Sequence, residues 1–508
     1  MSDSGEFSDS SPEMDRNPSP PPESEEAESA GEDAVDAIGA TVYSKHWLFS
    51  TLTKLIQTVT EQNSADTQDP AELSEEQEDE LCKVWDMAMD QDVSGFLQEF
   101  KAPDILLGVI AKSQCPRLTE ICVGILGNMA CFHDTCLDLS QNEDLGAVLL
   151  LLLGDADPPT LLETCRLLLT CMSQADVAPL WLERFHQQPS LCPSLLFIMS
   201  SSTNVDLLVK VGQLVDKLFD EDEGLMGSWL CGAHGGASRS HHGGGGGDSS
   251  GDNHHNEDED DDGSGDEPRP DVPTSLLEAA KQLRSESCEG LEVYLHAIQL
   301  LTTVDEGIQA LVCEQGAGAA VWAFLCAVVC EDLCQPDEPA LCLQEQKSLL
   351  GPALATLSAL HACQGPHFTV NTDVSLVGSV LRILQYHRDM QQISQQEAQS
   401  HPGGQPSSQE GGDEGKGEDR PRRGEDEQLT ALLECTCELL ASILAGISRD
   451  EVNELVKRGL LTEKTCSCAA QDLLPQHTAA VEHLASVLAD VEPKLAESLK
   501  SSSKQAQS

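Results

Sequence analysis

The chain is poor in two kinds of side chain that many binding proteins use. Aromatic residues make up 4% of its 508 residues, and 29 Lys and Arg stand against 87 Asp and Glu, which gives a formal charge of −58. Such a negative field repels nucleic-acid phosphates and anionic lipid headgroups. We therefore expect no nucleic acid and no membrane among its partners. The charge favours solubility, and the alternative is that it attracts a basic protein partner.

Long apolar runs and a secretory signal are also missing. The longest apolar block, residues 148–153, is far shorter than the roughly 20 residues of a membrane-spanning helix. The N-terminus is acidic and has no apolar segment of the signal-peptide kind. The 20 cysteines fall mostly on apolar helical faces, where a free thiol behaves as a small hydrophobic group. These features predict a reduced, intracellular protein.

The sequence lacks the motifs of common catalytic sites. It contains no nucleophile elbow, phosphate loop, dinucleotide fingerprint or metalloprotease helix. The glycine run at 243–247 is not followed by Lys-Ser or Lys-Thr, and no strand precedes it, so it does not read as a phosphate loop. We therefore predict that the protein is not an enzyme, with no catalytic residues and no cofactor.

Metal-binding patterns are weak. Cys435 and Cys437, like Cys466 and Cys468, are spaced C-x-C, whereas structural zinc sites usually use C-x-x-C pairs with matching second halves. The histidine pairs near 241 and 254 lie in a Gly- and Asp-rich stretch without fixed geometry. We expect the cysteines to pack in a core and predict no metal site.

What the sequence does contain is a helix that recurs. In 116–131 the apolar residues are spaced so that they line one face of an α-helix. They are Leu118, Ile121, Cys122, Ile125, Leu126 and Met129. A shift of 43 residues reproduces most of this face, and a second shift reproduces part of it. The matching residues are Leu161, Cys165, Leu168, Leu169 and Met172, then Leu207, Leu208, Val211 and Val215.

This period predicts the fold class. Repeats of roughly 40–47 residues with helical content are typical of armadillo and HEAT proteins. Leucine dominates and β-branched runs are scarce, which favours helices over sheets. We expect an all-α, armadillo/HEAT-like helical repeat solenoid with long disordered insertions. Ser74 and Gln77 have the spacing of a capping box, so a helix should begin there.

Composition divides the chain into segments. We expect a disordered acidic tail at 1–38, armadillo-like repeats at 39–231 and a disordered Gly/His/Asp-rich linker at 232–272. Continuing helical repeats should follow at 273–389, then a second disordered linker at 390–426. A C-terminal helical block at 427–498 and a disordered tail at 499–508 should complete the described order. Whether 273–498 continues the same solenoid stays open at this point.

Asn128 is the residue most suggestive of a binding groove. An asparagine near this point of an armadillo repeat can bond the backbone of a bound peptide. A groove of the importin type repeats this asparagine and places a tryptophan one turn before it. Here the positions one and two periods further on are Cys171 and Leu214, and one turn before Asn128 stands Gly124. Asn128 is therefore either a local structural contact or a groove contact, and we predict no further site residues.

Several stretches resemble the serum amyloid A-like protein 1 family, also called synoviocyte proliferation-associated protein. The matching segments are 39–49, 84–87, 96–100, 115–132, 157–171, 197–220, 300–305 and 343–347. The resemblance implies an armadillo-like nuclear protein that promotes proliferation of synovial fibroblasts under pro-inflammatory stimuli. It implies no catalytic residues, and the Gly- and His-rich stretch at 232–272 departs from the family pattern.

These observations combine into one functional expectation. We expect a non-enzymatic scaffold in the nucleus, with the cytoplasm as a further location, whose concave face binds a protein segment. That face would be formed by the helices at 116–131, 159–174 and 204–219. The alternative is an importin-like transport or chaperone adaptor that binds basic protein segments. Lys416, Arg420, Arg422 and Arg423 form a basic patch that acids interrupt, and it is a candidate nuclear-import signal.

Overall fold

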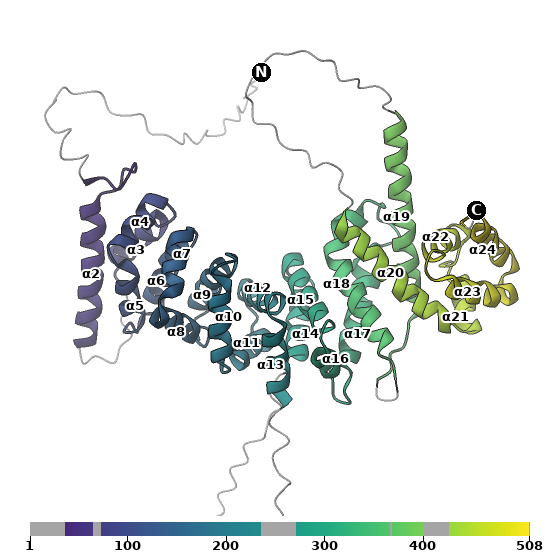
Figure 1. The fold of residues 1–508 in the computed structure, drawn as a ribbon, viewed down its shortest axis with the longest axis horizontal. Helices are drawn as coiled ribbons and strands as arrows, with labels where there is room; N and C mark the ends of the chain where they lie inside the picture. The colour runs from purple at the N-terminus through teal and green to yellow at the C-terminus, as the bar shows by residue number, and fades with distance from the viewer. Residues whose placement is uncertain (1–35, 65–72, 235–270, 366–367, 401–425, 507–508) are drawn as a thin grey trace, which may run out of the picture.

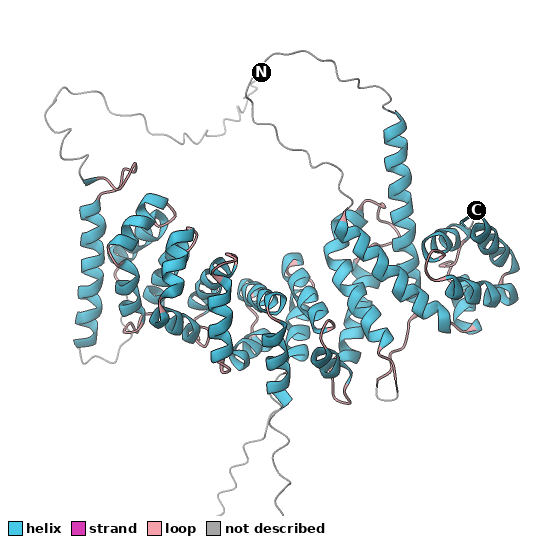
Figure 2. Ribbon diagram, in the orientation of Figure 1, coloured by secondary structure: helices cyan, strands magenta, loops and turns pink. Residues whose placement is uncertain are grey.

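A computed structural model of the chain describes residues 36–64, 73–234, 271–365, 368–400 and 426–506. Across these ranges the chain is helical, and the only β-type pairing is an isolated bridge between Ala37 and Ser44 (Figure 2). The helices follow one another along a continuous arc from α2 to α24 (Figure 1). The predicted all-α repeat solenoid is confirmed.

The helices group into repeats of a first, a second and a third helix. An incomplete repeat opens the chain, with α2 (Lys45–Ser64) and α3 (Glu75–Met87). Three full repeats follow: α4 (Gln91–Glu99), α5 (Ala102–Ile110) and α6 (Pro116–Met129); α7 (His133–Gln141), α8 (Glu143–Leu152) and α9 (Pro158–Met172); α10 (Ala178–Gln187), α11 (Leu191–Ser201) and α12 (Val205–Glu221).

The same order holds for two more repeats and then changes. The fourth repeat has α13 (Glu223–His234), α14 (Val272–Leu283) and α15 (Cys288–Leu301), and the fifth has α16 (Asp305–Val312), α17 (Gly318–Ala327) with a π-turn at Val328–Asp332, and α18 (Cys342–Ala362). Then come α19 (Val374–Ser400) and α20 (Glu427–Gly446), followed by α21 (Arg449–Lys457), α22 (Glu463–Leu473), α23 (Thr478–Val491) and α24 (Pro493–Ala506).

Local sequence explains where the third helices begin. Pro116 occupies the first turn of α6, where its missing N–H costs nothing. Asp157 caps α9 by accepting a hydrogen bond from the N–H of Thr160, and Asn204 caps α12 in the same way. Ser74 and Gln77 form the predicted capping box at the start of α3. The three predicted repeat helices therefore exist, with ends within a few residues of those expected.

The third helices stack on one another and form the core of the solenoid. The stack runs through α3, α6, α9, α12, α15, α18, α20 and α23, each in contact with the next. The predicted apolar face of α6 is buried throughout, and so are its counterparts in α9 and α12, except for Leu169, which is partly buried. In Figure 1, α12 and α15 lie on the inner side of the arc and α13 on its outer side.

Residues 271–506 continue the solenoid, which answers the question that the sequence left open. The hydroxyl of Tyr294 on α15 donates to the carbonyl of Leu208 on α12 at 2.8 Å, and its ring packs on Gly212. The second helices α11 and α14 are also in contact. The gaps at 235–270 and 401–425 therefore fall inside repeats: the first follows a first helix and the second follows a second helix.

Some predicted segment bounds need correction. Ile38 is buried, and the carboxylate of Asp36 accepts from His46 N, so ordered chain begins before residue 39. The helix α19 runs through Ser400, beyond the expected bound at 389, and α24 runs past 498 to Ala506. Both extensions are polar, which suggested a linker and a disordered tail, but they contain many good helix formers. The basic patch at 416–423 and the histidine pairs near 241 and 254 lie outside the described residues.

One helix, α20, has the length and hydropathy of a membrane-spanning segment. It contacts α18, α19 and α23 and buries Leu432, Leu439, Leu440 and Leu444. A core helix of a solenoid has the same apolar character because it is covered on several sides. Its hydropathy is thus explained by packing within this fold.

Candidate protein-binding surfaces

Asn128 lies on α6 at the junction with α3. Its side-chain Nδ2 donates to the main-chain carbonyl of Trp85 at 2.8 Å, and the residue is 7% exposed. The structure thus gives the amide a partner in the preceding repeat, which is the structural role considered for it. Its role as a groove contact stays a prediction.

The space one turn before Asn128 is filled from the neighbouring repeat. Gly124 stands at that position, and a Cβ placed on it would lie 2.2 Å from the ring of Trp85. From the other side, Arg166 of α9 donates to the Gly124 carbonyl at 3.1 Å and covers Gly127. A tryptophan is therefore present beside Asn128, but it belongs to α3, and its indole packs on α6.

Neighbouring third helices are also linked by charged and polar pairs. Arg117 on α6 bonds both Glu78 on α3 and Glu120, and these bonds raise its pKa. Arg166 pairs with Glu163 at 2.6 Å. Because its cations are paired with acids of the same surface, this part of the stack offers few free positive charges to a partner.

The pattern continues on α12 and α15. Lys210 donates to Gln213, which in turn donates to Glu289 on α15 at 2.7 Å. His296 Nδ1 lies 2.7 Å from Asp216, and this hydrogen bond raises the pKa of His296. We call the surface formed by the partly exposed side chains of α6, α9, α12 and α15 the third-helix face. It is polar and rich in carboxylates.

The cysteines considered as metal ligands are packed among other side chains. Burial raises the pKa of Cys437 and of Cys466 to about 12, and it also raises the pKa of Cys435 and Cys468. A thiol with so high a pKa stays protonated at neutral pH and is a poor ligand or nucleophile. Within the described ranges no group of His, Cys, Asp or Glu side chains has the arrangement of a metal site.

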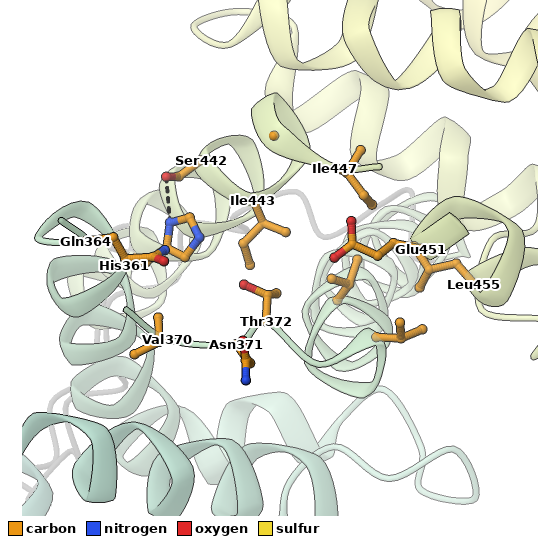
Figure 3. Close-up of a pocket in the computed structure, with 13 residues that line it drawn as sticks. His361, Gln364, Val370, Asn371, Thr372, Ser442, Ile443, Ile447, Glu451 and Leu455 are labelled. Carbon is orange, nitrogen blue, oxygen red and sulfur yellow. Dashed lines mark hydrogen bonds between the residues drawn. The ribbon is translucent and has the colours of Figure 1, made fainter. Parts of the chain in front are cut away.

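A cavity of about 400 Å³ lies where α18 and α20 end and α19 and α21 begin. We call it the α18–α21 cavity. Figure 3 shows His361 and Ser442 on one side of it and Glu451 and Leu455 on the other. The Nδ1 of His361 lies 2.8 Å from the Ser442 hydroxyl, and burial lowers the pKa of His361. Buried apolar side chains complete the lining, among them Val370, Val377, Ile443 and Ile447.

The sequence did not predict this cavity. One signal was available: the segment between α18 and α19 is short and lacks the helical apolar pattern that opens other repeats. A missing helix is harder to notice in a sequence than a present one, and the lining residues come from four separate helices and two of the segments that join them.

Comparison with known proteins gives a consistent picture. The family model described as the SAAL1 C-terminal domain matches residues 191–481. Protein saal1 of Danio rerio is 58% identical over 496 residues, covering 98% of this chain and 95% of its own length. Protein SAAL1 of Mus musculus is 47% identical over 499 residues, covering 96% and 98%. Among solved structures, a designed armadillo repeat protein aligns with a TM-score of 0.37 at 13% identity over 61% of this chain and 99% of its own.

Proposed function

This chain belongs to the SAAL1 family, and from that premise we propose that it is a non-enzymatic nuclear scaffold whose third-helix face binds a protein segment. The resemblance to serum amyloid A-like protein 1 seen in the sequence is confirmed by two relatives over nearly the full chain. A helical-repeat scaffold agrees with the fold. We further propose that its binding supports cell proliferation, as the resemblance implies for synovial fibroblasts under pro-inflammatory stimuli.

The observation that carries the proposal is the unbroken stack of third helices from α3 to α23. Solenoids of this kind present long surfaces on which an extended or helical segment can lie. The catalytic motifs of common enzyme classes are missing from the sequence, so binding is the activity that the architecture supports best. Cargo with basic residues would match the carboxylates of this face.

The contact residues differ from those of an importin-type groove. Asn128 already donates to Trp85, so a bound peptide would have to displace that bond. The importin-like alternative therefore has less support than a scaffold that uses charged side chains. We place the main contacts on α12 and α15, where Gln213, Glu289 and Glu292 are partly or fully exposed.

The proposal is tested by proximity labelling in nuclei with the full chain. We compare the wild type with a Gln213→Lys, Glu292→Lys double variant, which adds two positive charges and removes one carboxylate at α12 and α15. The matched control is Glu183→Lys on the first helix α10, which is not part of the third-helix face and where the side chain is exposed. We expect a set of labelled partners that is lost in the double variant and kept in the control.

Two outcomes would contradict the proposal. A partner set identical for all three proteins would place binding elsewhere on the molecule. A protein that is excluded from nuclei in cells would remove the nuclear part, while leaving the scaffold role to be tested with cytoplasmic labelling.

A further inference from the structure

We call α19 and α20 the sixth repeat; among the described residues it has no first helix. Elsewhere from α3 to α20, each third helix is followed directly by the first helix of the next repeat, as α9 is by α10 and α20 by α21. After α18 the next helix of the described chain is the second helix α19, and the described residues between them, 363–365 and 368–373, form no helix. The repeat pattern therefore leaves one helix position unoccupied between α16 and α21.

The α18–α21 cavity lies at that position. A first helix packs between the end of the previous third helix and the next first helix, as α10 packs on α9 and α13. It also reaches the end of its own third helix: His186 of α10 lies 2.8 Å from Asp222, just past α12. In the sixth repeat the corresponding helices are α18, α19, α20 and α21, and all four line the cavity.

Only part of this position is filled by the chain itself. Phe368 and Val370 from the short segment are buried, and Trp322 donates to the carbonyl of Asn371 at 3.2 Å, which holds the segment in place. Beyond them the space is open. A Cβ built on Gly446, at the end of α20, would meet no heavy atom within 4 Å.

The other first helices indicate what fits such a space. Two of them bury a pair of apolar side chains one turn apart: Trp181 and Phe185 in α10, and Val452 and Leu455 in α21. The walls of the cavity offer matching apolar contacts through Val377, Ile443 and Ile447. A helix with the same spacing would bury its anchors against these walls.

The charge of the residues that line the cavity indicates which kind of helix can bind there. Glu451 is the one charged residue that lines the cavity, on a chain with a formal charge of −58. His361 on the opposite side is kept neutral at pH 7 because burial lowers its pKa. An occupant with a cation next to its apolar anchors therefore complements the site, and an acidic occupant does not.

We propose that the α18–α21 cavity binds a short amphipathic helix of a protein partner, with two apolar residues one turn apart directed into the cavity and a basic residue beside Glu451. The helix takes the position of the missing first helix. This site is separate from the third-helix face, and it does not rest on the function proposed above.

A peptide from the chain itself serves as the probe. We use residues 176–189, which include α10 and its Trp181, Arg184 and Phe185, carrying fluorescein. The peptide carries Gln187→Lys, and a lactam joins this lysine to the side chain of Glu183; both positions are exposed in α10. The lactam is needed because a free peptide of this length is scarcely helical in water. By fluorescence anisotropy with the full-length protein we expect saturable binding with a Kd below about 500 μM. A peptide with Trp181→Ser and Phe185→Ser should not bind.

Two protein variants locate the binding. In Gly446→Leu the new Cβ meets no heavy atom within 4 Å, the leucine occupies space at the cavity wall, and helix propensity improves. The variant should therefore leave the melting temperature unchanged or raised while weakening peptide binding at least about tenfold. The matched control is Gly108→Leu in α5, where a Cβ also meets nothing within 4 Å. This control should bind the peptide like the wild type.

A third variant tests the charge. Glu451 accepts a hydrogen bond from Ser448 N in the capping box of α21, and Gln keeps that bond. Glu451→Gln should therefore leave α21 intact and lower affinity for the Arg184-containing peptide by about threefold or more, with a weaker dependence on salt.

The proposal is overturned by any of three results. One is the absence of saturable binding up to about 500 μM. A second is equal binding to the wild type and to Gly446→Leu. The third is a concentration-dependent dimer that Gly446→Leu abolishes, which would make a second copy of this chain the occupant. None of these results depends on the third-helix face, so the scaffold proposal is tested independently.

Discussion

Neighbouring repeats are joined by side chains that reach main-chain carbonyls across the helix boundary. The Asn128 side chain donates to the Trp85 carbonyl, 43 residues earlier in the chain. Arg166 donates to the Gly124 carbonyl, 42 residues earlier, and Gln174 donates to the Ala130 carbonyl, 44 residues earlier. These separations match the period found in the sequence. Each bond satisfies a buried or half-buried donor and fixes how one repeat sits on the next, because the carbonyl positions along a helix are discrete.

Gly124 should be intolerant of even a methyl group. Alanine would place its Cβ 2.2 Å from the Trp85 ring, so the indole must move from its position on α6. We expect Gly124→Ala to lower the free energy of unfolding by about 1–3 kcal/mol. In Gly108→Ala, where the Cβ is free, the same change should raise it by about 0.5–1 kcal/mol. Urea denaturation followed by tryptophan fluorescence measures both, and a stabilised Gly124→Ala would contradict the packing described.

The pair of His296 and Asp216 should make the α12–α15 junction sensitive to pH. The hydrogen bond to Asp216 raises the pKa of His296 above its ordinary value of 6.5, with further attraction from Asp220 and Glu292 and opposition from burial. Because the folded-state pKa exceeds the unfolded one, the stabilisation is complete below the unfolded pKa and is lost as pH rises through the folded pKa.

We therefore expect the urea midpoint to fall between about pH 6 and about pH 8, and to fall less in Asp216→Asn. An NMR titration of the imidazole gives the pKa directly. A value for His296 below 6.5 in the folded protein would show that burial outweighs the carboxylate.

At the level of single helices, α6 should be among the elements most sensitive to lost volume. Leu126 is fully buried in the stack between α3 and α9. Leu126→Ala should cost about 2–5 kcal/mol, the range for large-to-small changes in well-packed cores. Leu151→Ala on α8, where the side chain is 68% exposed, should cost less than about 0.5 kcal/mol. Chemical denaturation of both variants checks this, and similar small losses would mean that the α6 face is not the core.

Third helices were predictable from sequence because their apolar faces repeat. Leu118 and Leu161 mark the same position in successive repeats, and both are buried. First helices such as α16 are short, so their pattern is too brief to distinguish from a loop. The polar end of α19 resembled a linker because it has no repeating apolar face, although its residues include good helix formers.

The candidate sites were less predictable than the helices. The sequence identified Asn128 but not its partner, because Trp85 lies one period away and either a peptide or a carbonyl could accept from the amide. The α18–α21 cavity arises from a helix that is absent and from residues as distant as Val370 and Leu455. Such a site depends on how repeats stack, which the period alone does not specify.

For the whole molecule, the two long gaps in the described chain do not divide the solenoid. Contacts between α11 and α14 and between α12 and α15 carry the stack past 235–270, and contacts between α18 and α20 carry it past 401–425. At the second junction Gln344 donates to Asp426 at 2.7 Å, and Lys347 pairs with the same carboxylate. Long insertions are tolerated inside repeats because loop closure costs grow slowly with length.

This continuity predicts that the two fragments stay associated after the chain is cut. A site-specific protease sequence inserted within 240–247 allows cleavage between α13 and α14. The two parts should co-elute in size-exclusion chromatography at about 1 μM, because the buried Leu208, Tyr294 and Leu276 hold them together. In Gly212→Leu, whose Cβ would lie 2.6 Å from the Tyr294 ring, the cut parts should separate, while the uncut variant elutes as a monomer-sized species. Separation of the cut wild-type parts without denaturant would mean that the α12–α15 junction is weaker than its packing indicates.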